Sequence, residues 1–242
     1  MTAALQIQTI VSMPFQENTY IVWREGRTDT LVIDPGLEPD LILEFLDAQS
    51  LRVAAILNTH GHGDHIGGNE AIKQRFPDAP LIIGVNETAL LSDPNLNMSA
   101  PFGVSIISPP ADQTVNEGDV LEFAGLRLEV LEIPGHSPGH VVFVVRDSSS
   151  SALAGRASDG SDPPSLARPA NAGSGTIMVF GGDVLFRGSV GRCDMPGGSM
   201  KRLEAGIRAK LYTLPDDTVV YPGHGPVTKI GFEKKTNPFV QV

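Results

Sequence analysis

Residues 58–68 read NTHGHGDHIGG and place His60, His62, Asp64 and His65 within six positions. Imidazole and carboxylate groups are metal ligands, and the intervening glycines permit unusual backbone angles and close approach. His60 and His62 are two residues apart after a predicted strand, so both can point to one side of a loop. Asp64 and His65, at a predicted helix start, point to a neighbouring position. Because one ion cannot easily accept all four ligands, the motif predicts two metal ions lying close together.

The other histidines of the chain also lie in glycine-rich turns. His136 and His140 occur in PGHSPGH and His224 in YPGHG, so all six histidines belong to such motifs. A structural role does not require imidazole in a turn, whereas a metal site requires neutral imidazoles held close on tight backbone. Asp183, in FGGDVLF, ends a predicted strand where packing explains an acidic residue poorly. These nitrogen and oxygen donors suit zinc, iron or manganese.

The elements that must position these residues alternate between short strands and helices. β-Branched runs bounded by turn signals predict strands over 5–11, 19–23, 30–34, 53–60, 81–84, 119–133 (two strands around a turn), 140–147, 176–183 and 218–223. Helices are predicted over 40–49, 65–76, 87–91 and 199–214. Each half of the chain thus has strands followed by a helix. This order favours two sheets packed face to face with helices outside, in a single α/β domain over 1–242.

One segment departs from this pattern. Residues 147–175 contain no aromatic residue, no isoleucine and no valine, and serine, alanine, glycine and proline dominate. Such a composition cannot bury enough apolar area to offset the entropy of ordering the chain. It predicts a mobile low-complexity insertion between two strands, with a binding lid as the alternative interpretation.

The composition excludes several classes of protein. A formal net charge of −10 argues against nucleic acid as a partner, although a local basic pocket for an anionic substrate remains compatible with it. The single cysteine, Cys193, cannot form an intrachain disulfide. The first residues have neither the basic start nor the apolar core of a signal peptide, and no apolar run is long enough to span a membrane. We therefore expect a cytoplasmic protein that does not contact membranes, and the sequence leaves its oligomeric state open.

The motifs THGHGDH, PGHSPGH, GGDVLF and YPGHG, in this order, resemble those of the metallo-β-lactamase-fold hydrolases. The resemblance covers nearly the whole chain except the insertion. The segments FRGSVGRCDMPGG (186–198) and GHGPVTKIGFEKKTNPFV (223–240) are similar to the short glyoxalase II-like, or hydroxyacylglutathione hydrolase-like, enzymes of bacteria. This resemblance implies the four-layer αββα sandwich of the metallo-β-lactamase type.

The resemblance also implies roles for single residues. It implies two divalent metal ions, with zinc as the first expectation and iron or manganese as alternatives. The first ion would be held by His60, His62 and His136, the second by Asp64, His65 and His224, and both by Asp183. A water or hydroxide would bridge the two ions beside Asp183. Asp64 and Asp183, the carboxylates of this set, are the predicted catalytic residues.

Four further residues close to these motifs have either a functional or a purely structural interpretation. Asp34, in VIDPG, matches a family aspartate that supports the ligands from behind, or else caps the following turn. His140 matches a histidine of the family that does not bind metal. Arg192 either anchors a substrate carboxylate or is a solvated charge at the rim. Cys193 lies ten residues after Asp183, the position where the best-known zinc lactamases carry a cysteine ligand, and is interpreted as a bystander.

The function expected from this set is hydrolysis of a small acyl thioester. Two close cations lower the pKa of a bridging water from about 15.7 towards neutrality, so that hydroxide can attack a carbonyl. A thiolate leaving group, with a parent pKa of about 8.5, needs no strong general acid. The alternatives are a mononuclear iron persulfide dioxygenase and a hydrolase of another ester, lactone or phosphodiester on the same fold. A persulfide dioxygenase would need one iron held by two histidines and a carboxylate.

Overall fold

The structure is a computed structural model that describes residues 3–147, 154–157 and 176–241, and most of its strands form two mixed sheets. The first sheet has the order β10-β1-β2-β3-β4-β5-β6. Its strands are β1 (Leu5–Ser12), β2 (Glu17–Arg24), β3 (Asp29–Ile33), β4 (Arg52–Asn58), β5 (Leu81–Gly84), β6 (Gln113–Val115) and β10 (Ala154–Ala157).

The second sheet has the order β15-β14-β11-β9-β8-β7. Its strands are β7 (Val120–Phe123), β8 (Leu126–Glu132), β9 (Val141–Asp147), β11 (Thr176–Gly182), β14 (Val219–Pro222) and β15 (Thr228–Lys229). A small hairpin pairs β12 (Leu185–Phe186) with β13 (Ser189–Val190).

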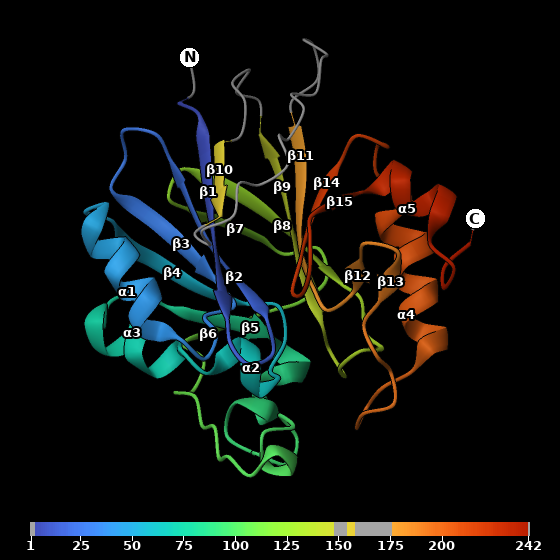
Figure 1. Cartoon of the computed structure of the whole chain (residues 1–242), viewed down its shortest axis with the longest axis horizontal. Helices are drawn as coiled ribbons and strands as arrows, with labels where there is room; N and C mark the ends of the chain where they lie inside the picture. The colour runs from blue at the N-terminus through green and yellow to red at the C-terminus, as the bar shows by residue number, and fades with distance from the viewer. Residues whose placement is uncertain (1–2, 148–153, 158–175, 242) are drawn as a thin grey trace.

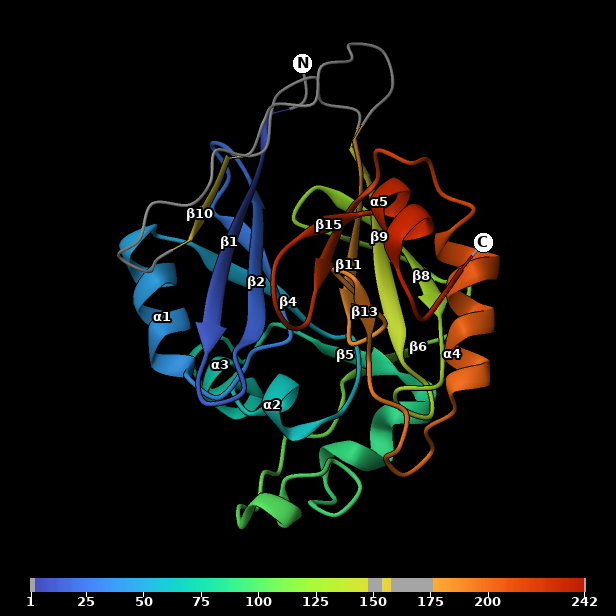
Figure 2. The same ribbon diagram turned by 45° about the vertical axis from the view of Figure 1, so that its right-hand side comes forward.

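Helices cover the outer face of each sheet (Figure 1, Figure 2). On the side of the first sheet lie α1 (Pro39–Ala48), α2 (Gly63–Ile66) and α3 (Asn69–Arg75), followed by 3₁₀ turns over Val85–Leu91 and Ala100–Phe102. On the side of the second sheet lie α4 (Met200–Gly206), which continues as a π-helix over Ile207–Leu211, and α5 (Ile230–Thr236). This arrangement confirms the predicted α/β four-layer αββα sandwich.

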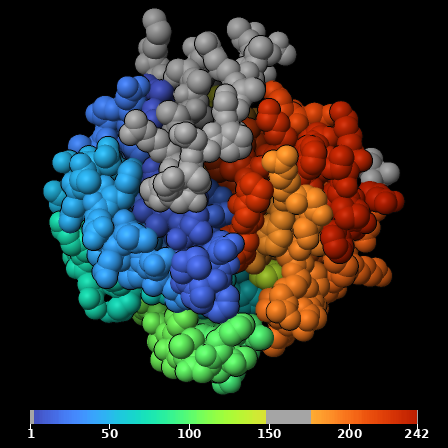
Figure 3. Space-filling model, viewed as in Figure 1, coloured from blue at the N-terminus to red at the C-terminus, as the bar shows by residue number. Residues whose placement is uncertain are grey.

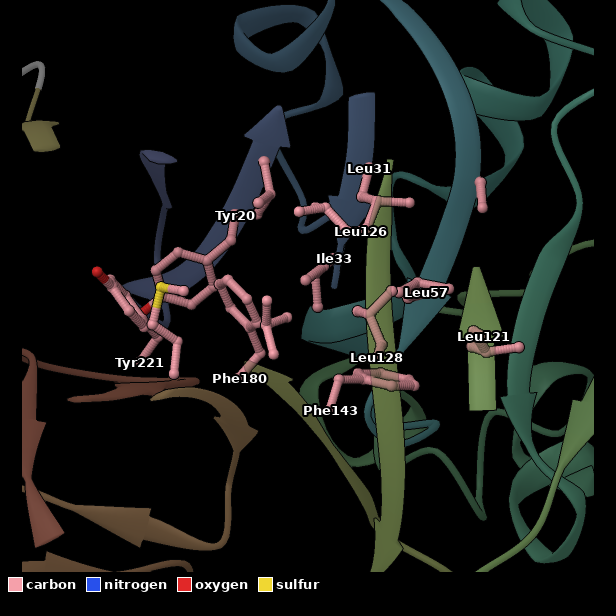
Figure 4. Close-up of a cluster of buried hydrophobic side chains, with 14 of the residues drawn as sticks. Tyr20, Leu31, Ile33, Leu57, Leu121, Leu126, Leu128, Phe143, Phe180 and Tyr221 are labelled. Carbon is pink, nitrogen blue, oxygen red and sulfur yellow. The ribbon is translucent and has the colours of Figure 1, made fainter. Parts of the chain in front are cut away.

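Alternation along the strands builds three apolar layers. In β3, Leu31 and Ile33 face the layer between the sheets, whereas Val32 faces the helices. In β9, Phe143 faces the inner layer and Val144 the layer beneath α4. Because successive side chains of a strand point to opposite faces, a strand buried on both faces must be apolar throughout. Figure 4 shows the inner layer, where the side chains of the two sheets meet.

The four histidine and aspartate motifs follow the carboxyl ends of central strands. NTHGHGDH follows β4, the loop with His136 follows β8, Asp183 follows β11, and His224 follows β14. β11 and β14 pair in parallel, so Asp183 and His224 leave the second sheet at the same edge. The sandwich thereby brings motifs that are far apart in the sequence to one edge, where α2 lies (Figure 1).

The helix predicted over 65–76 is wrong as one element, because it is divided into α2 and α3 at Gly67 and Gly68. The Gly68 N–H donates to the Pro35 carbonyl at 2.8 Å, outside the helix. A Cβ at Gly68 would lie 2.8 Å from the carbonyl oxygen of Gly36, so only glycine permits this approach. The break lets the short helix α2 keep an orientation of its own.

Of the predicted insertion over 147–175, the structure describes two parts. Asp147 ends β9, and residues 154–157 form β10, which pairs in parallel with β1 through Ile7 and Gly155. The remainder, 148–153 and 158–175, lies outside the described residues, so its predicted mobility stays a prediction. In the described part of the chain, the helices are too short or too polar to cross a bilayer.

Candidate metal centre

The loop after β4 places its histidines through bonds to neighbouring backbone. The Asn58 side chain donates to the His65 carbonyl at 3.0 Å, which ties the start of the loop to α2. The N–H of Gly63 donates to the carbonyl of Asn97 at 2.8 Å. His60 and His65 are fully buried. The glycine-spaced motif is thus fixed at both ends, and its imidazoles project into the molecule.

A first set of three imidazoles converges from two loops. His60 Nε2 lies 3.3 Å from His136 Nε2, and His62 Nδ1 lies 2.9 Å from the same His136 nitrogen. Burial, with the neighbouring imidazoles, holds the pKa of His60 well below its usual range and lowers that of His62 to about 3. Burial lowers the pKa of His136 as well, so the three side chains are neutral bases at physiological pH, the state in which imidazole binds a metal.

A second set lies beside the first and is rich in carboxylates. Asp64 Oδ2 lies 3.4 Å from His224 Nε2 and 3.9 Å from His65 Nε2. His65 Nε2 and His224 Nε2 are 3.4 Å apart. One ligand atom from each of these three residues lies within 4.8 Å of the others, as also holds for the first set. The structure thus brings together both predicted triads.

Asp183 lies between the two sets. Its Oδ2 is 3.5 Å from His136 Nε2 and 3.5 Å from His224 Nε2, while its Oδ1 is 3.4 Å from His65 Nε2. Within the described residues, Oδ1 is buried without a hydrogen-bond partner. A buried carboxylate oxygen facing imidazoles of two sets fits a position between cations. The donor set therefore fits the two metal ions that the sequence predicts.

The charge balance differs between the two sets. Burial opposes a charge on His65, but Asp64 and Asp183 outweigh it and raise the pKa of His65 well above its usual range. Burial also opposes ionisation of Asp183, but His65 and His136 lower the pKa of this carboxyl. The second set thus holds ionised carboxylates that need a positive charge beside them. A proton on His65 supplies that charge in the metal-free chain, and a cation would replace it.

Most ligand imidazoles are oriented through their second nitrogen. The Nδ1–H of His136 donates to the Arg192 carbonyl at 2.9 Å, and that of His224 donates to the Phe15 carbonyl at 3.0 Å. His65 Nδ1 lies 3.1 Å from Asp34 Oδ2. Such partners fix the ring and its tautomer, which leaves Nε2 free towards the site.

Asp34 sits behind the ligands. Its carboxylate accepts hydrogen bonds from Thr59 N at 2.7 Å and Thr59 Oγ1 at 2.6 Å, besides its contact with His65. Asp34 and His60 can also be grouped with His65 as possible ligands. Because its oxygens already bind Thr59 and His65, we interpret Asp34 as the support for the loop that the sequence predicts.

His140 is placed by the backbone beside the aspartate. The N–H of Asp183 donates to His140 Nε2 at 3.0 Å, and the His140 ring stacks on His60 with centroids 4.7 Å apart. A Cβ at Gly182, whose φ is +45°, would lie 2.7 Å from His140 Nε2. The lone pair of this nitrogen is therefore used in holding Asp183, as suits a histidine that does not bind metal.

Two buried carboxyl groups behind the site were missed by the sequence analysis. Glu87, in the 3₁₀ turn after β5, accepts hydrogen bonds from Gly61 N at 2.9 Å and Gly139 N at 2.6 Å. Glu17 Oε1 lies 4.0 Å from His65 Nδ1. Burial raises the pKa of both carboxyls. The only sequence signal is an acidic residue within a mostly apolar stretch, which is too common to identify them.

A cavity of about 600 Å³ opens onto both sets of ligands. Arg192 lines it, but its guanidinium binds Asp194 through two hydrogen bonds of 2.8 Å, and its side chain is 63% exposed. Cys193 is absent from the described groups of possible ligands, and its Sγ contacts the Gly191 carbonyl. The molecular surface is hollowed between the blue, green and orange segments (Figure 3).

Comparisons with known proteins agree with this geometry. Residues 12–149 match the family model of the metallo-beta-lactamase superfamily. The chain is 34% identical to the probable metallo-hydrolase YqgX of Bacillus subtilis, over 94% of this chain and 93% of that protein. It is 32% identical to the hydroxyacylglutathione hydrolase GloC of Haemophilus influenzae, over 98% of each chain.

Solved structures share the fold over nearly the full length. The B3 metallo-beta-lactamase BLEG-1 is similar with a TM-score of 0.81 and 31% identity, covering 98% of this chain and all of that one. TTHA1623 in a di-iron-bound form gives a TM-score of 0.73 and 36% identity, with 96% and 99% covered. ETHE1 from Myxococcus xanthus gives 0.69 and 25%, with 96% and 83% covered. The chain belongs to the metallo-β-lactamase superfamily and has the metal-ligand groups of a metallo-hydrolase.

Proposed function

We propose that this protein is a binuclear metallohydrolase that cleaves a small acyl thioester, in the manner of glyoxalase II. The observation that carries the proposal is the position of Asp183, whose oxygens face His136 on one side and His65 and His224 on the other. The first ion would be held by His60, His62 and His136, the second by Asp64, His65 and His224, and both by Asp183. Two divalent ions, zinc first and iron or manganese next, would supply Lewis-acid activation of a water and of the substrate carbonyl.

The residues of the chain define where the reaction takes place. Among the ligand side chains, Asp64 and His224 are the most accessible, with 21% and 25% of their side chains exposed, whereas His60 and His65 are buried. The substrate carbonyl therefore approaches from the side of Asp64 and His224, where the cavity opens. His60 and His65 are fully buried behind it, so bulk water does not reach them from the other side.

The proposed reaction has two steps, addition of water to the carbonyl and departure of the thiolate. The water oxygen adds to the thioester carbonyl carbon, and the Asp64 carboxylate accepts a proton of that water and passes it to solvent. The C–S bond breaks and its electron pair leaves on sulfur, which takes a proton from solvent. A thiol with a pKa of about 8.5 leaves readily as thiolate, so no dedicated acid is required. The absence of an acidic residue in the cavity lining other than Asp64 and Asp183, within the described chain, agrees with such a leaving group.

The relatives support a small-molecule substrate. GloC bears the name of a hydroxyacylglutathione hydrolase and is aligned with this chain along 98% of both sequences. TTHA1623 was solved with two irons, so a binuclear site exists on this fold at 36% identity. The net charge of −10 is unfavourable for a nucleic-acid substrate. We place the enzyme in the reducing cytoplasm because its one cysteine cannot form an intrachain disulfide.

The experiment offers two substrates to protein loaded with zinc and, separately, with iron. The first is lactoylglutathione, with release of thiol followed, and the second is glutathione persulfide in an oxygen electrode. Thiol release at neutral pH that stops on chelation supports the hydrolase. Oxygen uptake with persulfide, together with no thiol release from any thioester, would falsify it in favour of a dioxygenase.

A further inference from the structure

One side of the cavity is lined by apolar side chains that have no role in holding metal. They come from the β1–β2 turn and from the segment before β6, and we call them the apolar wall: Phe15, Met98, Pro101, Phe102, Val104 and Ile106. The rings of Phe15 and Phe102 join the two segments, with centroids 4.9 Å apart and planes at 74°. The wall is continuous with the metal ligands, because His62 and Asp64 line the same cavity.

The apolar wall is held rigidly against the metal loop. The side chain of Asn97 donates to the carbonyls of Leu90 at 3.0 Å and Ile106 at 2.9 Å, and its Oδ1 accepts from Ser99 N at 3.1 Å. The carbonyl of Asn97 accepts from Gly63 N, the residue between His62 and Asp64. The wall therefore has a fixed position relative to the ligands and needs little ordering when a ligand binds.

Large apolar surface on this wall remains exposed to solvent. Phe102 is 60% exposed and Val104 is 50% exposed. Water contact with such groups is unfavourable, and an apolar ligand that covers them gains their burial. A binding site of about 600 Å³ also has the size of pockets that enclose whole small molecules, larger than an acetyl or lactoyl group requires.

The β12–β13 hairpin and the loop after it contribute the one cationic group of the cavity. The lining residues from this segment are Phe186, Ser189, Val190, Arg192 and Met195, and Arg192 is the one lysine or arginine among the described lining residues. A charged or polar thiol carrier is therefore favoured on this side. With the carrier at Arg192 and the scissile carbonyl at the accessible Asp64 and His224, the apolar wall is the part of the lining left for the acyl group.

We propose that the cavity selects thioesters whose acyl group is apolar and extended, such as a medium-chain fatty acyl or an aryl group, packed on Phe102 and Phe15. This inference rests on the proposed thioester hydrolysis and deepens it. It assigns the specificity to the acyl group, with Phe102 as the residue that contributes most, since it offers the largest exposed ring.

The experiment measures kcat/KM for one thiol carrier bearing lactoyl, acetyl, butanoyl, hexanoyl and benzoyl groups. Burying a methylene contributes about 0.8 kcal/mol, which corresponds to about fourfold in affinity. Because the apolar wall is partly open to solvent, kcat/KM should rise by about two- to fourfold for each added methylene. Hexanoyl and benzoyl thioesters should then exceed the lactoyl thioester. In F102A the ratio of kcat/KM for the hexanoyl thioester to that for the acetyl thioester should fall by about tenfold, mostly through a higher KM for the hexanoyl thioester. F102L should restore most of this ratio.

The matched control is F239A, because Phe239 is 52% exposed and does not line the cavity. Its acyl preference should equal that of the wild type. If thiol is released from all thioesters at equal rates, or fastest from lactoyl, the acyl inference is overturned while the thioester hydrolase stands. If no thioester releases thiol, both the hydrolase and the acyl preference are overturned. A preference for long acyl groups that F102A leaves intact would overturn the role of the wall.

Discussion

Glu87 accepts a hydrogen bond from the backbone N–H of Gly61 at 2.9 Å, between the histidines His60 and His62. Its other oxygen accepts from Gly139 N at 2.6 Å, next to His140 and three residues after His136. The same carboxyl is buried. One side chain therefore fastens the two loops that carry the first metal set to each other, although it contacts no metal-ligand nitrogen itself.

Glu87→Gln should weaken metal binding more than it weakens the fold. The amide would present its NH₂ group to one of the two backbone N–H groups, so one buried donor would lose its acceptor. This loss costs about 1–3 kcal/mol of stability. Loss of such a supporting partner typically lowers metal affinity by about 10- to 100-fold. Competition with a chromophoric chelator measures the metal affinity, and Glu44→Gln, at an exposed position, is the control. Equal metal affinity in Glu87→Gln and wild type would mean that Glu87 acts on folding alone.

Asp183→Ala should lower metal occupancy, because Asp183 is the carboxylate that faces both sets of imidazoles. Without it, two cations would face each other with one negative charge fewer between them. We expect fewer than two equivalents per chain after dialysis and loss of turnover. Elemental analysis of the variant is the measurement, and two equivalents bound with unchanged affinity would show that Asp183 does not bridge.

Glu17→Gln should stabilise the metal-free protein increasingly as the pH rises. Burial raises the pKa of the Glu17 carboxyl well above its ordinary range. Below an unfolded pKa of about 4.3 the group is protonated in both states. Above it the unfolded chain releases a proton that the folded chain keeps, so wild type loses up to about 1.4 kcal/mol per pH unit until the folded pKa is passed.

Urea unfolding of both proteins in chelator, at half-unit steps between pH 5 and pH 8, measures this difference. The advantage of Glu17→Gln should widen with pH, whereas Glu44→Gln, at an exposed position of α1, should follow the wild type. A difference that is constant across this range would contradict a raised pKa for Glu17.

Arg192→Ala tests the predicted anchor for a substrate carboxylate. Arg192 lines the cavity beside Met195, while its guanidinium is bound to the exposed Asp194. An exposed pair of this kind is worth little, so a substrate carboxylate can exchange with Asp194 at low cost. KM should rise several-fold for a carboxylate-bearing carrier and stay unchanged for a neutral carrier such as N-acetylcysteamine. Equal KM changes for both carriers would show that Arg192 is a rim charge.

The glycine-spaced histidines could be singled out from the sequence because their signal is local. His60, His62 and His65 occur within one glycine-rich turn, and the strand before them is apolar over 53–57 because β4 packs against both apolar layers there. The prediction that Asp183 bridges two ions came from its place at a strand end together with the family resemblance, since no spacing relates it to the histidines. The sequence predicted two sheets packed face to face, but it did not predict which strands pair with each other.

The parts that the sequence did not predict depend on contacts between distant segments. The partners of Glu87 are backbone groups of Gly61 and Gly139, and only the folded chain brings them together. The division of the helix predicted over 65–76 depends on the approach of Gly68 to the Pro35–Gly36 backbone. The short strands β6, β12, β13 and β15 have two or three residues each, too few for a periodic pattern to appear.

The number of ions that turnover needs is measured by titrating metal-free protein with zinc while thiol release from a hexanoyl thioester is followed. Asp183 faces both sets of imidazoles, so the proposed binuclear hydrolase should turn over only when both sets are filled. We expect the rate to stay low up to one equivalent per chain and to reach its maximum at two. A rate that is already maximal at one equivalent, or thiol release that persists in metal-free protein, would contradict the binuclear hydrolase.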